Sequence, residues 1–272
     1  MKETNLPLGR ESDYPQKYAP EVLCSISRRE TREPLGLADE LPFTGVDIWN
    51  AWELTWLGPG DLPKVATAEI HVPADSPHIV ESKSLKLYLN SFAMSSFASE
   101  TAVAETIARD LSPCVGAPAK VSVLPVSGTE ARQTARLAGD CLDDLEVSCA
   151  DWEVNADLLR ADASTPVTED LHSHLLRSLC PVTAQPDIGS LQISYSGPQI
   201  DRAGLLRYIV SFREHNDFHE ACIERMFVDL LERCACEKLT VHARYQRRGG
   251  IDINPLRTNT REPALNLRLW RQ

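Results

Sequence analysis

The segment SLKLYLNSF at residues 84–92 has a counterpart in DRAGLLRYIVSF at residues 201–212. At a constant offset of 120 positions, four residues match: Leu85, Tyr88, Ser91 and Phe92 correspond to Leu205, Tyr208, Ser211 and Phe212. Both segments have the apolar spacing of a helix. The sequence therefore predicts two related helices, one in each half of the chain, within an internal repeat.

The segments around these helices predict the rest of each repeat. In the first half we expect a strand and a turn over 43–63, strands over 65–72, 119–126 and within 141–154, and a second helix over 100–112. In the second half we expect a short helix over 171–180, strands over 190–197 and 238–245, a helix over 217–234 and a turn into a strand over 247–255. The first half then has the order β-β-α-α-β-β, and the second half repeats this order from its strand over 190–197 onward. This order predicts an α+β fold in which helices pack on one face of each antiparallel sheet.

Length and composition limit the class of protein. The 272 residues, 43% apolar and 25% charged, fit one or two globular domains and exclude a disordered chain, a collagen and a coiled coil. We expect an N-terminal arm over 1–40, a first module over 41–155 and a second over 156–272. No stretch has the length and apolarity of a membrane helix, and the first 18 residues lack the apolar core of a signal peptide. We therefore expect a cytoplasmic protein without a membrane partner.

The net charge of −11 argues against nucleic acid as a partner. Residues 201–272 nevertheless hold 13 basic and 10 acidic side chains, a local excess of +3. This excess favours a small anionic ligand such as a phosphate, although a solvated face of mixed charge explains it equally well. No Cys and His stand at a convincing metal-ligand spacing, and Cys234-x-Cys236 alone is a weak signal, so we expect no metal.

One candidate site lies in SLCPVTAQPDIGS at residues 178–190. Cys180 comes at the end of the expected short helix, immediately before Pro181, and Asp187 lies in a loop that two prolines and a glycine make rigid. A thiol beside a carboxylic acid suits nucleophilic addition coupled to proton delivery. The alternative is a buried structural cysteine and an aspartate in a turn.

Three further motifs carry polar side chains at helix ends or turns. In FHE at 218–220, one interpretation is that His219 and Glu220 both line a pocket at the start of a helix. The alternative is that Glu220 only complements the helix dipole. In ESKS at 81–84, the two serines resemble helix N-caps, and Lys83 stands near a helix start, where phosphate binds readily. RRGG at 247–250 combines arginines with glycines that permit close approach. The chain contains neither GxGxxG nor GxxxxGK, so a nucleotide would not bind on a Rossmann or P-loop scaffold.

These motifs together resemble one family. ESKSLKLYLNSF at 81–92, SLCPVTAQPD at 178–187, and FHE at 218–220 with RRGGIDINP at 247–255 are similar to the NADPH-dependent 7-cyano-7-deazaguanine reductases, the nitrile reductases of queuosine biosynthesis, in their long two-module form. The resemblance runs from about residue 40 to the C-terminus. It implies tandem tunnelling-fold modules, a homodimer, and reduction of the nitrile to 7-aminomethyl-7-deazaguanine with two NADPH and without a metal.

The resemblance also implies roles for individual residues. Cys180 would attack the nitrile carbon to form a covalent thioimide, Asp187 would protonate the nitrogen, and His219 would assist proton transfer. The residues implied to bind the substrate are Val80, Glu81, Ser82, His219 and Glu220. Those implied to bind NADPH are Ser82, Lys83, Arg248 and Gly249. One site per chain would combine Glu81 from the first module with Cys180 from the second.

Three other functions compete with this one. A cyclohydrolase of the same fold would need zinc held by Cys and His. A hydrolase built on Cys180, His219 and Asp187 would convert a nitrile to amide or acid without consuming NADPH. A non-catalytic module would bind a deazapurine or a tRNA and would tolerate loss of Cys180.

Overall fold

The computed structural model describes residues 14–37, 40–127, 133–261 and 263–272. The chain forms two compact units. The first unit takes the described residues up to Glu30, from Ile48 to Gln133, and from Arg247 to Asp252. The second takes the described residues from Thr31 to Asp47, from Thr134 to Gln246, and from Ile253 to Gln272. The module boundaries expected after residues 40 and 155 stay a prediction.

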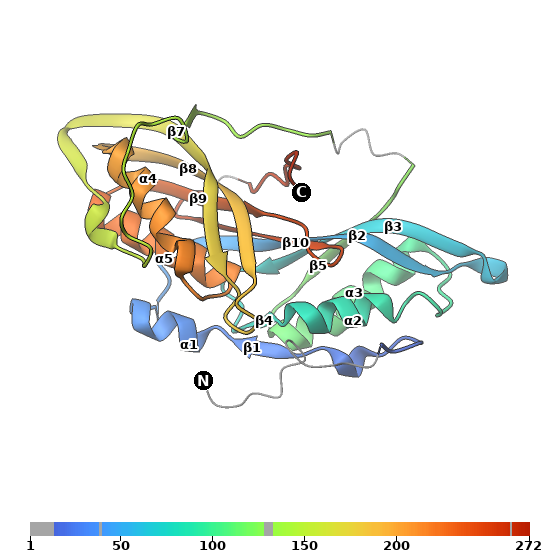
Figure 1. Ribbon diagram of the computed structural model, residues 1–272. Helices are drawn as coiled ribbons and strands as arrows, with labels where there is room; N and C mark the ends of the chain where they lie inside the picture. Colours follow the sequence, from blue (N-terminus) through green and yellow to red (C-terminus); the bar gives the residue numbers. More distant parts are fainter. Residues whose placement is uncertain (1–13, 38–39, 128–132, 262) are drawn as a thin grey trace. The chain divides into compact units, whose positions relative to one another are not determined.

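The first unit contains two helices and a small antiparallel sheet. Its elements are β1 (Ser25–Ser27), most of β2 (Thr44–Leu57), β3 (Pro63–Pro73), β4 (His78–Val80), α2 (Ser82–Asn90), α3 (Glu100–Val115) and β5 (Lys120–Pro125). Strand β3 lies between β5 and β2, and the short strands β1 and β4 pair separately. Figure 1 shows α2 and α3 side by side. The core is apolar, with Trp56, Ile70, Leu85 and Ile107 at most 1% exposed.

The second unit contains the two longest strands among the described residues. Its elements are β6 (Asp140–Cys141), β7 (Ala161–Leu179), β8 (Pro186–Ile200), α4 (Arg202–Ser211), α5 (His219–Cys234), β9 (Lys238–Tyr245) and most of β10 (Ile251–Thr258). The short helix α1 (Arg29–Arg32) begins in the first unit and ends in the second. The strand order is β10-β9-β8-β7-β6, antiparallel apart from the parallel pair β6 and β7. Helices α4 and α5 pack against strands of this sheet (Figure 1).

Most of the expected elements are confirmed. The four long helices α2 to α5 occupy the expected segments, and β9 has the expected bounds of 238–245. Helix α4 begins where Asp201 accepts a hydrogen bond from the N–H of Ala203, and α3 begins where Ser99 accepts one from Ala102. The mixed fold with antiparallel sheets is therefore the one that the alternating patterns indicated. No helix among the described residues is long and apolar enough to span a membrane.

The short helix expected over 171–180 is wrong, because residues 171–179 belong to β7 and Cys180 directly follows this strand. Leu171 and Ser173 are fully buried while His172 and His174 are partly exposed, which is the alternation of a strand. A β-bulge between Ser173 and Leu176 then shifts the alternation by one residue. The shift spaces the leucines as in a helix and explains the error. Of the strand expected within 141–154, only Cys141 lies in a strand, at the end of β6.

The internal repeat reappears as the same contacts within each unit. In the first, the Tyr88 hydroxyl donates to Asp110 at 2.7 Å, and in the second the Tyr208 hydroxyl donates to Asp229 at 2.6 Å. The serine three positions after each tyrosine donates to the carbonyl oxygen of that tyrosine, at 2.6 and 2.7 Å. Each tyrosine ring also meets the following phenylalanine edge to face, with centroids 5.2 and 5.4 Å apart. The matching residues therefore make the same hydrogen bonds and ring contacts in both halves.

Candidate active site

Cys180 lies at the turn that joins β7 to β8. It follows the last residue of β7 and is 5% exposed. Its N–H donates to the carbonyl of Gln185, and its carbonyl accepts from the N–H of Ala184, both at 2.9 Å. Ala184 adopts a left-handed conformation with φ of 54°, which lets the chain reverse within a few residues. The backbone on both sides of the thiol is therefore held by the turn.

The end of β7 is also tied to the segment that leads into α5. The N–H of Leu179 donates to His215 at 2.8 Å, and the carbonyl of Leu179 accepts from the N–H of Asp217 at 3.1 Å. Helix α5 begins two residues after Asp217, at His219. The start of this helix is thereby fixed beside the β7–β8 turn.

Asp187 and His219 meet at this end of the unit. Asp187 pairs with Ser178 across the hairpin, so the two side chains share a face of the sheet, and both are buried. The Nε2 atom of His219 lies 3.6 Å from Oδ1 of Asp187. This distance is long for a hydrogen bond. It is within the limit of about 4 Å between nitrogen and oxygen that is used for ion pairs. A carboxyl group and an imidazole thus lie together beside the segment that carries Cys180.

The ring of His219 is positioned by Tyr245, the last residue of β9. The two rings meet edge to face with centroids 4.1 Å apart and planes at 80°. Tyr245 pairs with Gly189 on β8, and a Cβ atom at residue 189 would lie 3.1 Å from Cδ1 of the tyrosine. Gly189, expected to make a loop rigid, instead lies within a strand and leaves room for this ring.

Two protonated groups surround the carboxylates. Burial raises the pKa of the Cys222 thiol and of the Tyr245 phenol. Asp217, Asp187 and Glu220 raise the pKa of Cys222 further, and Asp187 and Glu220 also raise that of Tyr245. Both groups therefore keep their protons at neutral pH. The sequence did not indicate that Cys222 and Tyr245 lie beside these carboxylates. Cys222 belongs to the apolar stripe of a helix, and Tyr245 is the last residue of a strand.

Glu220 is 3% exposed and is the second residue of α5. The first turn of a helix favours a carboxylate there, so the helix dipole stabilises its negative charge. The structure thus gathers four of the expected residues at one end of the second unit: Cys180, Asp187, His219 and Glu220.

The other expected residues belong to the first unit. Glu81 is the N-cap of α2, and its carboxylate accepts from the N–H groups of Lys83 and Ser84, both at 2.7 Å. The expectation that Ser82 and Ser84 cap this helix is wrong, because the side chain of Glu81 reaches the same N–H groups. Val80 ends β4 and is buried, whereas Ser82 and Lys83 are partly exposed in the first turn of α2.

The RRGG turn lies against α2 within the same unit. Gly249 and Gly250 have φ of 64° and 83°, and the N–H of Arg248 donates to Ile251 at 2.9 Å. A Cβ atom at residue 249 would lie 3.2 Å from Cδ and Cε of Lys86. The guanidinium of Arg247 lies 5.7 Å from the centre of the Trp52 ring. Basic side chains and a glycine backbone without Cβ atoms thus meet at one turn, an arrangement that suits a phosphate group.

Comparison with known proteins places the chain among the nitrile reductases. Residues 14–123 match the family "Nitrile reductase, 7-cyano-7-deazaguanine-reductase N-term", and residues 186–264 match the family "QueF-like protein". An NADPH-dependent 7-cyano-7-deazaguanine reductase from Azoarcus sp. (strain BH72) is 53% identical over 257 residues, covering 94% of this chain and 91% of the relative. A protein of the same name from Paraburkholderia xenovorans (strain LB400) is 51% identical over 274 residues, covering 100% of both. The chain therefore belongs to the NADPH-dependent 7-cyano-7-deazaguanine reductase family.

Proposed function

We propose that this chain reduces 7-cyano-7-deazaguanine to 7-aminomethyl-7-deazaguanine with two NADPH, as a step in queuosine biosynthesis. The names of the full-length relatives supply the substrate and the reductant. The observation within the structure that carries the proposal is the Asp187–His219 pair beside the turn that bears Cys180. This group of side chains contains a nucleophile and a route for its proton.

The chemistry explains why a nucleophile is needed. A nitrile carbon accepts hydride poorly, and covalent addition splits one hard step into easier ones. The sulfur of Cys180 forms a bond to the nitrile carbon, while one carbon–nitrogen π bond breaks. The thiol proton passes to the Asp187–His219 pair, and a proton from this pair moves to the nitrogen. The net change is addition of S–H across the triple bond, which leaves a thioimide on Cys180.

NADPH, when bound, supplies one hydride to the former nitrile carbon in each of two rounds. Between the rounds the carbon–sulfur bond breaks, Cys180 regains its thiolate, and a free imine remains. The Asp187–His219 pair holds the protons that the nitrogen takes up. Two hydrides and two protons in all convert the nitrile to a primary amine.

Recognition of the base is assigned to carboxylates. A carboxylate accepts two neighbouring N–H groups such as those on the guanine-like edge of the substrate. Glu220, buried next to His219, is proposed for this edge. Val80, Glu81 and Ser82 keep the substrate-binding role that the family resemblance implies. In Glu81 each carboxylate oxygen already accepts one backbone N–H, which fixes the orientation of its remaining lone pairs.

The residues proposed for NADPH are Ser82, Lys83, Arg248 and Gly249. The space around Gly249 supports this assignment, because any side chain there would press on Lys86. An exposed backbone beside basic side chains fits the phosphates of this cofactor. We also propose tandem tunnelling-fold modules, which the repeated Tyr–Asp contacts support, a homodimer, and a location in the cytoplasm.

The test is to follow absorbance at 340 nm with purified protein, NADPH and 7-cyano-7-deazaguanine. The wild type should consume two NADPH for each nitrile, and mass spectrometry should identify the amine. Cys180→Ala should consume none. Cys236→Ala is the matched control, because Cys236 is also 5% exposed but lies at the far end of α5.

Other outcomes would contradict the proposal in distinct ways. Consumption of the nitrile without NADPH would indicate the hydrolase. Unchanged NADPH consumption in Cys180→Ala would exclude Cys180 as the nucleophile. Binding of the nitrile without any turnover by the wild type would indicate a binding module.

A further inference from the structure

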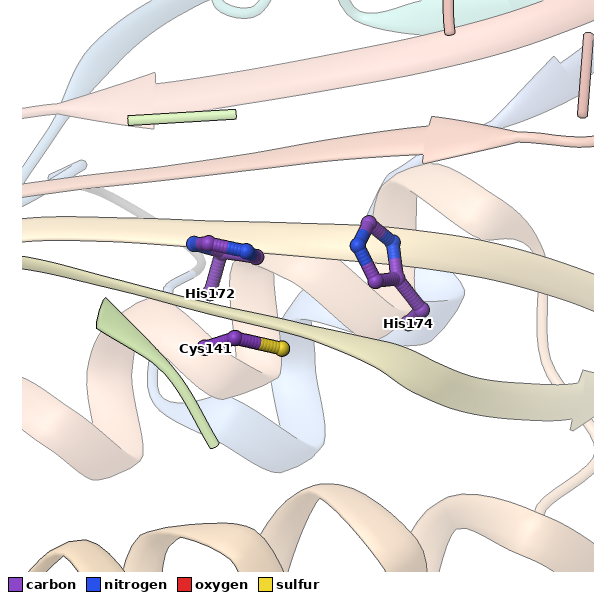
Figure 2. Close-up of side chains that lie close together, drawn as sticks. All are labelled: Cys141, His172 and His174. Carbon is purple, nitrogen blue, oxygen red and sulfur yellow. The ribbon is translucent and has the colours of Figure 1, made fainter. Parts of the chain in front are cut away.

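We propose that Cys141, His172 and His174 form a site for a divalent metal, zinc first, in the second unit and separate from the Cys180 group. One potential ligand atom from each of the three residues lies within 4.8 Å of the other two. Figure 2 shows the three side chains close together, with Cys141 and the two histidines coming from different segments of the chain. Neither the family match nor the sequence analysis, which expected no metal, assigns a role to them.

Strand pairing brings the three residues together. Cys141 stands opposite His172 in the parallel pair of β6 and β7. His172 and His174 are two residues apart on β7, so they project from the same face of the strand, and their ring centroids are 5.3 Å apart. In the sequence Cys141 is 31 positions from His172, which is why spacing alone did not reveal the group.

The chemistry of the set fits zinc. One thiolate and two imidazoles are ligands that zinc prefers, with Zn–S of about 2.3 Å and Zn–N of about 2.0 Å. Neighbouring ligand atoms in such a tetrahedron are roughly 3.5 Å apart. The ligand atoms of the three residues all lie within 4.8 Å of one another, which allows this spacing. Since Cys141 is exposed and both histidines are partly exposed, small side-chain rotations can close the set.

Both imidazoles already have the outer partners that a metal site requires. Nδ1 of His172 lies 3.0 Å from the carbonyl oxygen of Ala138, and Nδ1 of His174 lies 2.8 Å from Oγ of Ser190. A backbone carbonyl only accepts, so Nδ1 of His172 carries the proton and Nε2 keeps its lone pair. Arg271 donates to the same Ser190 oxygen at 3.0 Å. Such partners fix the ring orientation and the tautomer of metal-bound histidines.

A cavity adjoins the site and leaves a coordination position open. It has a volume of about 630 Å³, and His172, His174, Ser190, Trp270 and Arg271 are among its lining residues. Three protein ligands leave a fourth position in a tetrahedral zinc site, and water or a small ligand fills it in sites that are not purely structural. The guanidinium of Arg271 beside the histidines favours an anionic ligand at that position.

The experiment uses the full chain, treated with a chelator and dialysed, and titrated with Co²⁺ as a spectroscopic substitute for zinc. The wild type should bind one Co²⁺ per chain and develop a thiolate-to-cobalt charge-transfer band that added Zn²⁺ abolishes. Cys141→Ala should lose the band and bind zinc at least ~100-fold more weakly, since loss of even an outer-shell partner costs about 10–100-fold. Cys149→Ala, in the segment that follows β6, is the matched control and should keep both.

Two more variants make the result specific. Ser190→Ala should weaken zinc binding by about 10–100-fold while the cobalt band remains at saturation. Cys141→Ala should leave NADPH consumption unchanged, which separates this site from the Cys180 group and shows that the variant folds. A wild-type protein that takes up no stoichiometric cobalt would overturn the proposal. A band that survives in Cys141→Ala would overturn it as well.

Discussion

Nε2 of His219 lies 3.6 Å from Oδ1 of Asp187, although 32 positions separate them in the sequence. The pair exists because β7 and β8 form a hairpin that ends beside the start of α5. Both side chains are largely shielded from solvent, with Asp187 6% and His219 14% exposed. The two residues are therefore expected to act as one unit.

The first prediction tests this coupling. Asp187→Asn and His219→Gln should each lower kcat for nitrile reduction by about 10²–10⁴-fold, the usual contribution of general acid–base catalysis. The double variant should lose no more than the worse single variant, because groups that act together are not additive. Asp170→Asn, at an exposed position on β7, is the control. Losses that multiply in the double variant would contradict a shared proton route.

The second prediction concerns the turn that contains Gly249. Gly249→Ala should raise KM for NADPH by about tenfold or more, because the added methyl group would press on Lys86. Gly60→Ala is a matched control, since Gly60 has φ of 72° but no heavy atom within 4 Å of its Cβ position. Both variants bear the strain of a left-handed alanine, roughly 1–2 kcal/mol. Steady-state kinetics should show a change in KM only for Gly249→Ala. Equal changes in KM for both variants would contradict the prediction that the contact with Lys86 is the cause.

The third prediction concerns a buried cation. Arg257 is fully buried, with Nη1 2.7 Å from Asp47 and Nη2 2.8 Å from Glu224. Arg257→Met should lower the free energy of unfolding by about 3–5 kcal/mol, because it leaves buried carboxylates without this partner. Arg233→Met removes an exposed ion pair with Asp157 and should cost at most about 1 kcal/mol. Urea denaturation measures both, and a similar small loss in the two variants would contradict the prediction.

The fourth prediction is a pH dependence of stability. Burial, with a smaller contribution from Arg244, lowers the pKa of His242 to about 3. The unfolded chain has a histidine pKa near 6.5 and binds this proton first, so stability falls as the pH drops from about 6.5 towards 3. One such group changes the free energy of unfolding by at most about 1.4 kcal/mol per pH unit.

His242→Gln should therefore flatten the acid side of the stability profile. The half-buried His78, in the other unit, provides the control variant His78→Gln. Chemical denaturation at a series of pH values between 4 and 7 would show the difference. A profile that is as steep in His242→Gln as in the wild type would assign the acid sensitivity to other groups.

Local patterns were enough to predict most of the fold. The spacing of apolar residues located the four long helices, and alternation located β9 to the residue. Alternation failed at residues 171–180, because the bulge at Ser173 and Leu176 breaks the period of two and mimics the period of a helix. The bulge is defined by the pairing of β7 with β8, so the sequence of β7 alone does not reveal it.

In the candidate site too, local patterns predicted some residues, whereas others depend on contacts between distant segments. Cys180, Asp187, His219 and Glu220 were singled out because each stands beside a proline, a glycine or a helix start. Tyr245 was missed because its contact with the His219 ring depends on the space that Gly189 leaves across the sheet. Pairing between strands also explains why the group around Cys141 was missed. The role assigned to each of the four residues stays a prediction until the variants are measured.

The duplicated tyrosine–aspartate contact gives each unit its own optical reporter. Burial raises the pKa of both Tyr88 and Tyr208, and the neighbouring aspartate raises it further. Each phenol is therefore expected to ionise at a higher pH while its own helix pair is closed than after the pair opens. The part of the phenolate absorbance that disappears in Tyr88→Phe would then report the opening of the first unit. The part that disappears in Tyr208→Phe would report the opening of the second unit. Alkaline titration could thus determine whether two halves with the same internal contacts open together or in sequence.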